Sequence, residues 1–257
     1  MSEASTVAAV RAAGGPIEEI VAIYMLHPET FEQTTKNGYE HPLAGYFAGR
    51  SGVLGDATAD VVSSIMVFFE PSVVRGFWEQ GLPVHGGLGG AKIYYEQAAE
   101  FARKYLTGVE RLDRLVELGE KVIESAPAQG FPLFAGWRAM PRASDTPARA
   151  FQVLFVLREL RGSVHNDAFA VSGLTPIEAH MLNRGKDYCA FFGWQEPFAS
   201  GEDKRSAYEA AEDTTNRRMA EIVGSALSAE EADELAQLAS AALETVKAAA
   251  TPDEASS

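Results

Sequence analysis

The chain has 257 residues, 46% of them hydrophobic and 23% charged, which is the balance of a globular protein with a real core. Its 36 acids outnumber its 22 bases and give a formal net charge of -14, which disfavours a nucleic-acid partner because phosphate backbones are bound through Lys and Arg. A single cysteine, Cys189, excludes an intramolecular disulfide and a cysteine-rich zinc site.

The sequence predicts neither a membrane span nor an export signal. No apolar run approaches the roughly 20 residues needed to span a bilayer, and the N-terminus has no apolar core of signal-peptide length. We therefore expect a cytoplasmic protein with no membrane partner. Residues 1–15 and 251–257 are small, polar and rich in Ala and Ser, which predicts mobile ends.

Helical signals dominate the first half of the chain. Pro16 opens an apolar stretch with acids in its first turn, where the helix dipole favours them. Pro71 opens a short helix that ends before a glycine-rich break at 82–92. A long amphipathic helix follows this break, and another is predicted over 109–124 from its leucine spacing. We take 16–126 as an N-terminal helical lobe.

The second half is also helical. Prolines predict a connector over 127–146, and a strong helix follows from Pro147 to about His165. Helical patterns continue to about residue 250, with a break at 191–203, so 147–250 is the predicted C-terminal lobe. No Asn-Gly or Asp-Gly turn lies between alternating apolar runs. The predicted fold class is all-α, a two-lobed helical bundle.

Two segments resemble an actinobacterial family of MarR-related helix-turn-helix proteins. In Tyr46 to Trp78, a Tyr-Phe-Ala run is followed by an Arg, then Leu-Gly, then a helix that ends in an aromatic pair and Pro. In Leu157 to Leu182, Arg-Gly is followed by a His, then Gly-Leu and a Glu, and Glu209 to Arg218 looks like the family's acidic helix. The resemblance implies a fold related to MarR and winged-helix proteins and a homodimeric, helix-turn-helix-like C-terminal lobe.

The chain departs from this family after Gly193 and Trp194. Relatives carry a longer, wing-like segment there, whereas only a short segment separates Trp194 from Lys204, so we expect a reduced or missing wing. The recognition helix would be Thr175 to Asn183, which contains no Lys or Arg. A helix that reads the major groove usually carries such side chains. A DNA-binding transcription regulator therefore ranks last among the expected functions.

The most specific local feature is a set of cations on an apolar helix. Arg161 and His165 lie four residues apart and hence on one face, and Arg158 lies three residues before Arg161. A guanidinium and an imidazole on such a face can clamp an anion or carboxylate, with the His as an acid or base. The alternative is structural, with Arg161 paired to an internal carboxylate and His165 bonded to a backbone carbonyl.

A second candidate set lies in the first lobe. Tyr46 and Arg50 are four residues apart, and Arg50 either points into a cavity between the lobes or caps its own helix. Phe69 and Trp78 belong to an aromatic-dense region that supplies either pocket walls or core. Glu70 lies beside Phe69, and desolvation there could raise the pKa of its carboxyl.

These features predict binding of a small, partly apolar, anionic ligand in a cleft between the two lobes. The alternative is a cofactor-independent or haem-dependent enzyme that uses the Arg161/His165 pair, with His165 as general base or axial ligand. His180 is a second candidate for a haem ligand, although nothing in the sequence demands a cofactor. No histidine pair has metal-ligand spacing, so no metal site is predicted.

The predicted homodimer would form through the terminal helices. The helix over 229–249 presents an apolar stripe of Leu235, Leu238, Ala242 and Val246 at helical spacing. Such a stripe needs a partner, either a second copy of the chain or another part of the same chain.

Overall fold

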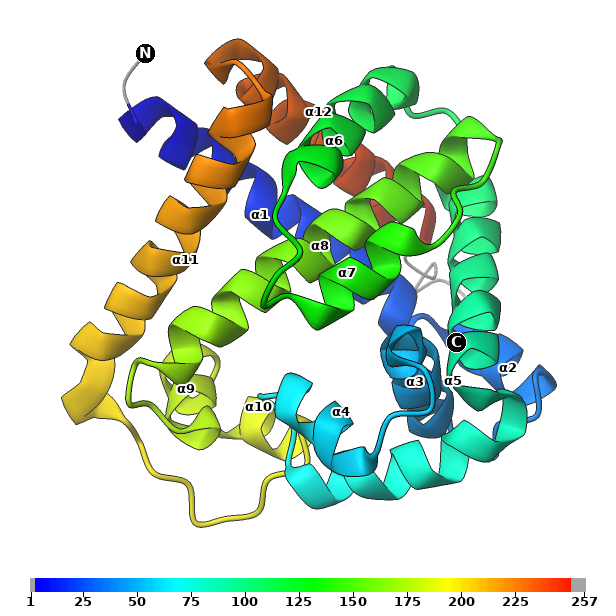
Figure 1. Cartoon of the computed structure of the whole chain (residues 1–257), viewed down its shortest axis with the longest axis vertical. Helices are drawn as coiled ribbons and strands as arrows, with labels where there is room; N and C mark the ends of the chain where they lie inside the picture. Colours follow the sequence, from blue (N-terminus) through cyan, green and yellow to red (C-terminus); the bar gives the residue numbers. More distant parts are fainter. Residues whose placement is uncertain (1–2, 251–257) are drawn as a thin grey trace.

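The computed structural model describes residues 3–250, which form α-helices and two short 3-10 helices, with no β-strand among them (Figure 1). The elements in chain order are α1 (Glu3–Leu26), α2 (Pro28–Lys36), α3 (Pro42–Ser51), η1 (Gly52–Leu54), α4 (Ala59–Ile65), α5 (Pro71–Tyr105), α6 (Leu112–Ser125), α7 (Pro132–Ala139), α8 (Thr146–Ala170), α9 (Pro176–Asn183), α10 (Lys186–Phe191), η2 (Glu202–Lys204), α11 (Arg205–Ala226) and α12 (Ala229–Ala250). The predicted all-α bundle is confirmed.

The core is organised around α8. Each of the seven residues from Phe151 to Leu157 is at most 4% exposed, because α1, α5, α6, α7 and α11 all pack against this helix. A helix that is apolar on all sides belongs in the interior of a bundle. The near-continuous apolar sequence of this helix is therefore explained by its central place.

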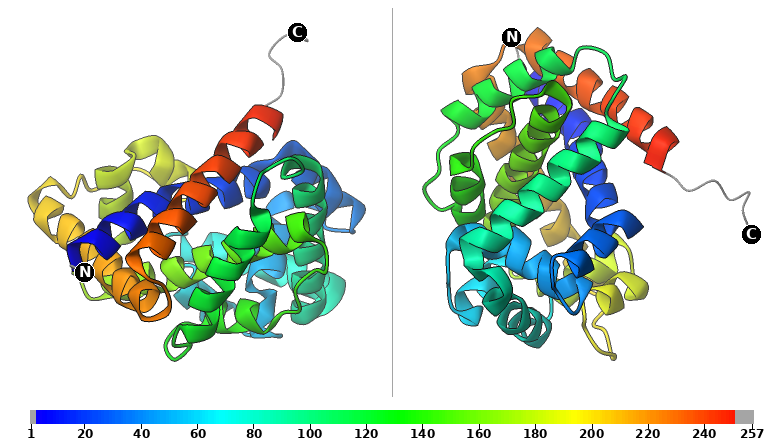
Figure 2. Two further views of the ribbon diagram at one scale, coloured as in Figure 1. Left: turned by 90° about the horizontal axis from the view of Figure 1, so that it is seen from above. Right: turned by 90° about the vertical axis from the view of Figure 1, so that its right-hand side faces the viewer.

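The first and last described helices lie side by side. Figure 2 shows α12 running along α1, and α1 contributes Ala9, Val10 and Ala13 to the core. The predicted helix start at Pro16 is therefore wrong, because residues 3–15 belong to α1 rather than to a mobile tail. The predicted mobile end at 251–257 lies outside the described residues.

The apolar stripe of α12 is covered by the protein itself. Leu235, Leu238, Ala242 and Val246 are all buried, and α12 packs against α1 and α6. The stripe therefore packs on its own chain, which is the alternative to a dimer contact. The homodimer remains a prediction that rests on the resemblance alone.

One hydrophobic cluster contains helices from both predicted lobes. The Tyr24 ring of α1 lies 5.6 Å from the Phe101 ring of α5 and 5.5 Å from the Phe151 ring of α8. Within the predicted connector, α7 buries Trp137, whose indole N–H donates to the Arg50 carbonyl at 3.0 Å. The boundary of the lobes at 127–146 stays a prediction, although side chains on both sides of it share this core.

Pro71 opens α5 as predicted, but the predicted break at 82–92 is a kink inside this element. Gly86 has φ 68° and ψ 173°, a conformation that residues with a side chain rarely adopt. The next residue, Gly87, lets the chain after η1 approach the backbone of α5. A Cβ atom on Gly87 would lie only 2.2 Å from the Gly55 carbonyl oxygen.

Replacing Gly87 with Ala should lower the free energy of unfolding by about 1 to 3 kcal/mol, the usual result of overpacking. The contact is with backbone atoms, which cannot rotate away. Gly76→Ala is the matched control, because a Cβ atom there meets nothing within 4 Å in the same helix. Urea denaturation should show the control unchanged or slightly stabilised. Equal stability of the two variants would contradict the close approach.

Candidate functional site

Two of the arginines predicted to contact a ligand, Arg50 and Arg158, form an ion network with the buried Glu159 and the partly exposed Glu18. Arg50 donates to both carboxylate oxygens of Glu159, at 2.9 and 3.1 Å. Arg158 donates to Glu159 at 2.9 Å and to Glu18 at 2.9 Å. The Glu159 side chain is only 1% exposed, so its two ion pairs lie away from water, whereas the Glu18 side chain at the edge of the network is 44% exposed.

The ion network is electrically balanced within the protein. Burial alone would raise the pKa of Glu159, but the charges of Arg50 and Arg158 outweigh it and hold this pKa below its ordinary value. The Tyr46 hydroxyl accepts a hydrogen bond of 2.6 Å from Arg50. Arg50 is thus paired with a carboxylate of α8, and its contact with a ligand stays an untested prediction.

The pair Arg161 and His165 also meets a carboxylate of the protein. Arg161 Nη2 lies 3.4 Å from Glu212 Oε2 of α11, and His165 Nδ1 lies 3.7 Å from the other oxygen. Thr215 donates its hydroxyl proton to the Ala211 carbonyl, so His165 Nδ1–H donates to Thr215 Oγ1, at 3.3 Å. Burial lowers the pKa of His165. The charge of Glu212 opposes this shift, and the charge of Arg161 adds to it. A ligand-clamping role for this pair stays an untested prediction.

The remaining predicted ligand contacts occupy structural positions. Trp78 is buried and donates to the Ala57 carbonyl at 3.0 Å. Phe69 packs against the Phe192 ring at 4.5 Å. Glu70 caps the start of α5, where its carboxylate accepts from the Val73 N–H at 3.1 Å. These three side chains thus have structural partners, and their contact with a ligand stays an untested prediction.

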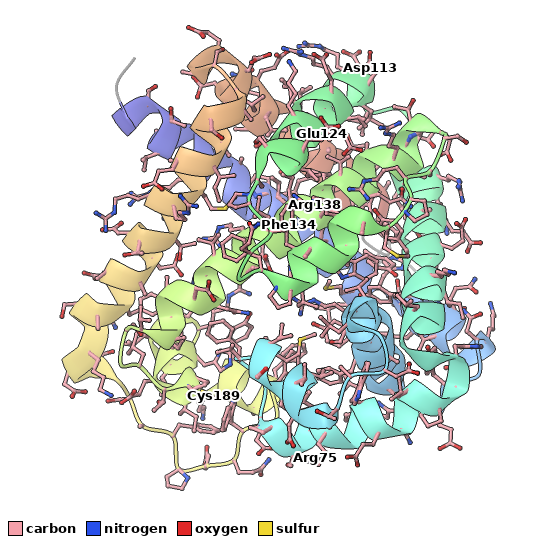
Figure 3. All side chains as sticks on the ribbon, in the orientation of Figure 1. Arg75, Asp113, Glu124, Phe134, Arg138 and Cys189 are labelled. Carbon is pink, nitrogen blue, oxygen red and sulfur yellow. The ribbon has the colours of Figure 1, made fainter. Side chains whose placement is uncertain are left out.

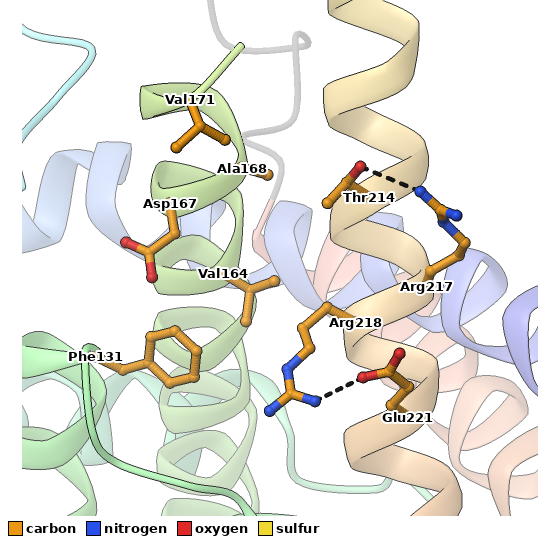
Figure 4. Close-up of a pocket in the computed structure, with 9 residues that line it drawn as sticks. All are labelled: Phe131, Val164, Asp167, Ala168, Val171, Thr214, Arg217, Arg218 and Glu221. Carbon is orange, nitrogen blue, oxygen red and sulfur yellow. Dashed lines mark hydrogen bonds and ion pairs between the residues drawn. The ribbon is translucent and has the colours of Figure 1, made fainter.

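Two hollows in the described surface involve none of the predicted site residues. The first, of about 480 Å³, lies between α8 and α11 (Figure 4). Its walls are Phe131, Val164, Asp167, Ala168, Val171, Thr214, Arg217, Arg218 and Glu221. Arg218 is neutralised there by Glu221 at 2.6 Å. The second, of about 220 Å³, lies beside α10 and includes Lys186, Ala190 and Trp194.

Residues 3–250 contain neither a membrane-spanning helix nor a cluster of metal-binding side chains. No helix in this range is long and apolar enough to cross a membrane. No group of three or more His, Cys, Asp or Glu side chains in it is placed to hold a metal ion. The single cysteine, Cys189, is buried in α10, with Sγ 3.7 Å from the Ile177 carbonyl oxygen.

Two short helices, α9 and α10, are joined by the two-residue turn Arg184–Gly185, and we call residues 176–191 the α9–α10 unit. Thr175 and Glu178 form a capping box at its start, with hydrogen bonds of 2.8 and 3.2 Å. Gly185 has φ 80°, which lets the chain turn sharply into α10.

The α9–α10 unit is fixed to the rest of the protein on one side. The Phe68 carbonyl accepts hydrogen bonds from His180 Nε2 at 2.8 Å and from the Trp194 indole at 2.9 Å. Lys204, just before α11, forms an ion pair with Glu178 at 2.8 Å. In Figure 3, Cys189 marks this unit at the edge of the molecule away from α6. The unit is therefore both rigidly attached and peripheral.

Cations without an acidic partner are rare in this protein. Seventeen of the 22 lysines and arginines form ion pairs with described acids. The five that do not are Lys92, Arg138, Arg184, Lys186 and Arg217. Two of these, Arg184 and Lys186, are close neighbours at the turn and at the first residue of α10, and both are exposed.

A family model described as a helix-turn-helix family matches residues 10–252. The chain belongs to this family. No curated protein and no solved structure matches it. The match confirms the helix-turn-helix part of the predicted resemblance, whereas the relation to MarR proteins, the actinobacterial origin and the reduced wing stay predictions.

Membership of the helix-turn-helix family overturns the predicted function. A small-molecule ligand between two lobes was the expected function, and a DNA-binding regulator ranked last; the family points to the regulator. The predicted recognition helix, Thr175 to Asn183, corresponds to α9, whose buried residues include Glu178 and His180. Its role as the recognition helix stays an untested prediction.

The residues that sequence reasoning missed are Arg184 and Lys186. The signal was present as a short Asn-Arg-Gly-Lys segment directly after a capped helix. A glycine between two helical segments is typical of the turn in a helix-turn-helix. Whether these cations are paired depends on side chains from distant segments, which only the fold brings near them.

Proposed function

We propose that this protein is a DNA-binding regulator that contacts duplex DNA through the α9–α10 unit. The observation that carries the proposal is the exposed pair Arg184 and Lys186, at the turn and at the start of the second helix. Neither has an acidic partner among the described residues, and the Arg184 guanidinium lies 5.0 Å from the centre of the Tyr188 ring. In helix-turn-helix proteins the second helix lies in the major groove, and residues near its N-terminus contact base edges. That helix is α10 in this protein.

The side chains around α10 have the chemistry that DNA requires. Lys186 can donate to the guanine O6 and N7 atoms, and the exposed amides of Asn183 and Gln195 suit the adenine edge. Arg184, in the turn, can reach a phosphate oxygen. All four side chains are exposed, three of them in the α9–α10 unit and Gln195 shortly after it.

The charge of the unit differs from that of the whole chain. Arg184 and Lys186 balance Glu178 and Asp187, so residues 176–191 carry no net charge, against -14 for the protein. Glu178 is further neutralised by Lys204. Acids elsewhere are screened from the DNA because the Debye length is only about 8 Å at physiological ionic strength. We therefore expect binding that weakens steeply as salt is raised.

The test is fluorescence anisotropy with labelled random-sequence duplex DNA over a series of salt concentrations. The wild-type protein should bind, and the Arg184→Ala/Lys186→Ala variant should bind about tenfold or more weakly at low salt. Each lost phosphate contact should also flatten the plot of log affinity against log salt by about 0.9. The far-UV circular dichroism of the variant should match that of the wild type, since both side chains are exposed.

Lys92→Ala is the matched control for the single variants Arg184→Ala and Lys186→Ala. Lys92 is also exposed and unpaired within the described residues, but it lies on α5. Its removal changes the net charge by the same amount and should leave DNA affinity unchanged. Absence of binding by the wild type, or an equal loss in Lys92→Ala, would reject the proposed DNA interface.

A further inference from the structure

The outer face of α10 carries an exposed aromatic ring beside its cation. Phe191 is 57% exposed, and Phe31 of α2, at 37%, is the only other exposed Phe, Tyr or Trp side chain among the described residues. Lys186, Asp187 and Ala190 are exposed as well. Residues spaced by four share a helix face, so Lys186 and Ala190 lie in one row and Asp187 and Phe191 in the next.

The Phe191 ring is held in place rather than left free. It lies nearly parallel to the Tyr188 ring, with centroids 6.3 Å apart, and 5.3 Å from the Phe192 ring. Phe192 is in turn stacked on His180 at 4.5 Å. Leaving such a ring in water forgoes the free energy that its burial would contribute. An exposed ring that packs against two other rings is therefore suited to contact a partner.

Duplex DNA offers one apolar group to a helix in the major groove, which is the C5-methyl group of thymine. We infer that Phe191, with Ala190, contacts thymine methyl groups and so makes thymine a specificity determinant of the binding site. This inference rests on the proposed function, because it requires α10 to lie in the major groove. The charge of the same face supports DNA as the occupant, since Lys186 and Arg184 have no acidic partner there.

The thymine methyl is a better assignment than a second copy of this chain. A protein contact through Phe191 would bury Lys186 and Asp187 with it, and charged side chains are depleted at the cores of protein interfaces. The major groove instead accommodates charged and apolar side chains together, because it presents hydrogen-bonding edges and methyl groups side by side.

The experiment compares thymine with deoxyuridine, which lacks only the methyl group. Duplexes are first selected with wild-type protein from a random-sequence pool. Each selected duplex is then synthesised again with deoxyuridine in place of one thymine at a time. Wild-type affinity should fall about threefold to tenfold at one or two positions, the effect of about one buried methyl group. Other positions should be unaffected.

Phe191→Ala should bind the thymine and deoxyuridine duplexes equally well. Its residual affinity should match that of the wild type for the deoxyuridine form. Phe31→Ala is the matched control, because it removes an exposed phenylalanine from α2 and should keep the full preference for thymine. If Phe191→Ala prefers the thymine duplex as strongly as the wild type does, Phe191 does not contact the thymine methyl group.

The outcomes separate this inference from the proposed function. Equal wild-type binding of both forms would overturn thymine recognition and leave DNA binding intact. Failure to bind any duplex would overturn both. Light scattering of wild-type protein and Phe191→Ala is the last check. A wild-type oligomer that dissociates in the variant, with no thymine preference, would show that Phe191 contacts a second copy of the chain and would overturn the inference.

Discussion

Replacing Glu159 with Gln should lower the free energy of unfolding by about 3 to 5 kcal/mol, the usual loss when one partner of a buried ion pair is removed. Glutamine has nearly the same shape as glutamate, so the decrease in the free energy of unfolding reflects the removed charge rather than a change in side-chain volume. Arg50 would lose its only carboxylate partner, and Arg158 would keep Glu18 alone. Urea denaturation followed by circular dichroism at pH 7 measures the change.

Glu221→Gln is the control for this prediction. Glu221 also pairs with an arginine, Arg218, but its side chain is 61% exposed. Exposed ion pairs contribute about 1 kcal/mol or less because water and salt screen them. A similar small loss in Glu159→Gln would mean that water reaches the ion network in solution.

Acid should destabilise the protein in two stages. Burial lowers the pKa of both His165 and His180 below the ordinary value of 6.5, against the opposing effects of Glu212 on the first and the Phe68 carbonyl on the second. The unfolded chain therefore takes up these protons at a higher pH than the folded chain does. Stability should be constant above about pH 7.5 and should decline as the pH falls through 6.5 toward the lower folded values.

The second stage comes from carboxylates. The pKa of Glu159 is held below its ordinary value of 4.5, so its contribution is complete above this value and is lost as the pH falls through the folded pKa. Urea midpoints at pH 8, 6.5, 5.5 and 4 test both stages. His165→Gln should reduce the first stage. Equal midpoints at pH 8 and 5.5 would contradict the buried state of these imidazoles.

The fold class could be predicted from the sequence because helical periodicity and capping are local. Pro71 marked the start of α5 correctly. Pro16 led to a wrong prediction of the helix start. A proline is common in the first turn of a helix, but this one lies inside α1, which packs against α11 and α12. Those contacts join segments far apart in the chain, and no local pattern reports them.

The site was harder to predict than the fold for the same reason. Arg50 and Arg158 were correctly noticed as cations on apolar helices, but their partner Glu159 lies 109 residues from Arg50 in the sequence. Local spacing cannot show such a pairing. Conversely, the sequence does not distinguish Arg184 and Lys186, because a cation without an acidic partner looks the same in sequence as one with a partner. Only the presence or absence of a nearby carboxylate in the fold separates Arg184 and Lys186 from Arg50 and Arg158.

The pairing of α1 with α12 has a consequence for the synthesis of the protein. At roughly 5 to 20 residues per second, α12 leaves the ribosome on the order of ten to forty seconds after α1. During that interval the side of α1 that later meets α12 has no native cover. The nascent chain therefore passes through a period in which an apolar helix is available to chaperones or to other nascent chains. The synthesis of α12 ends that period.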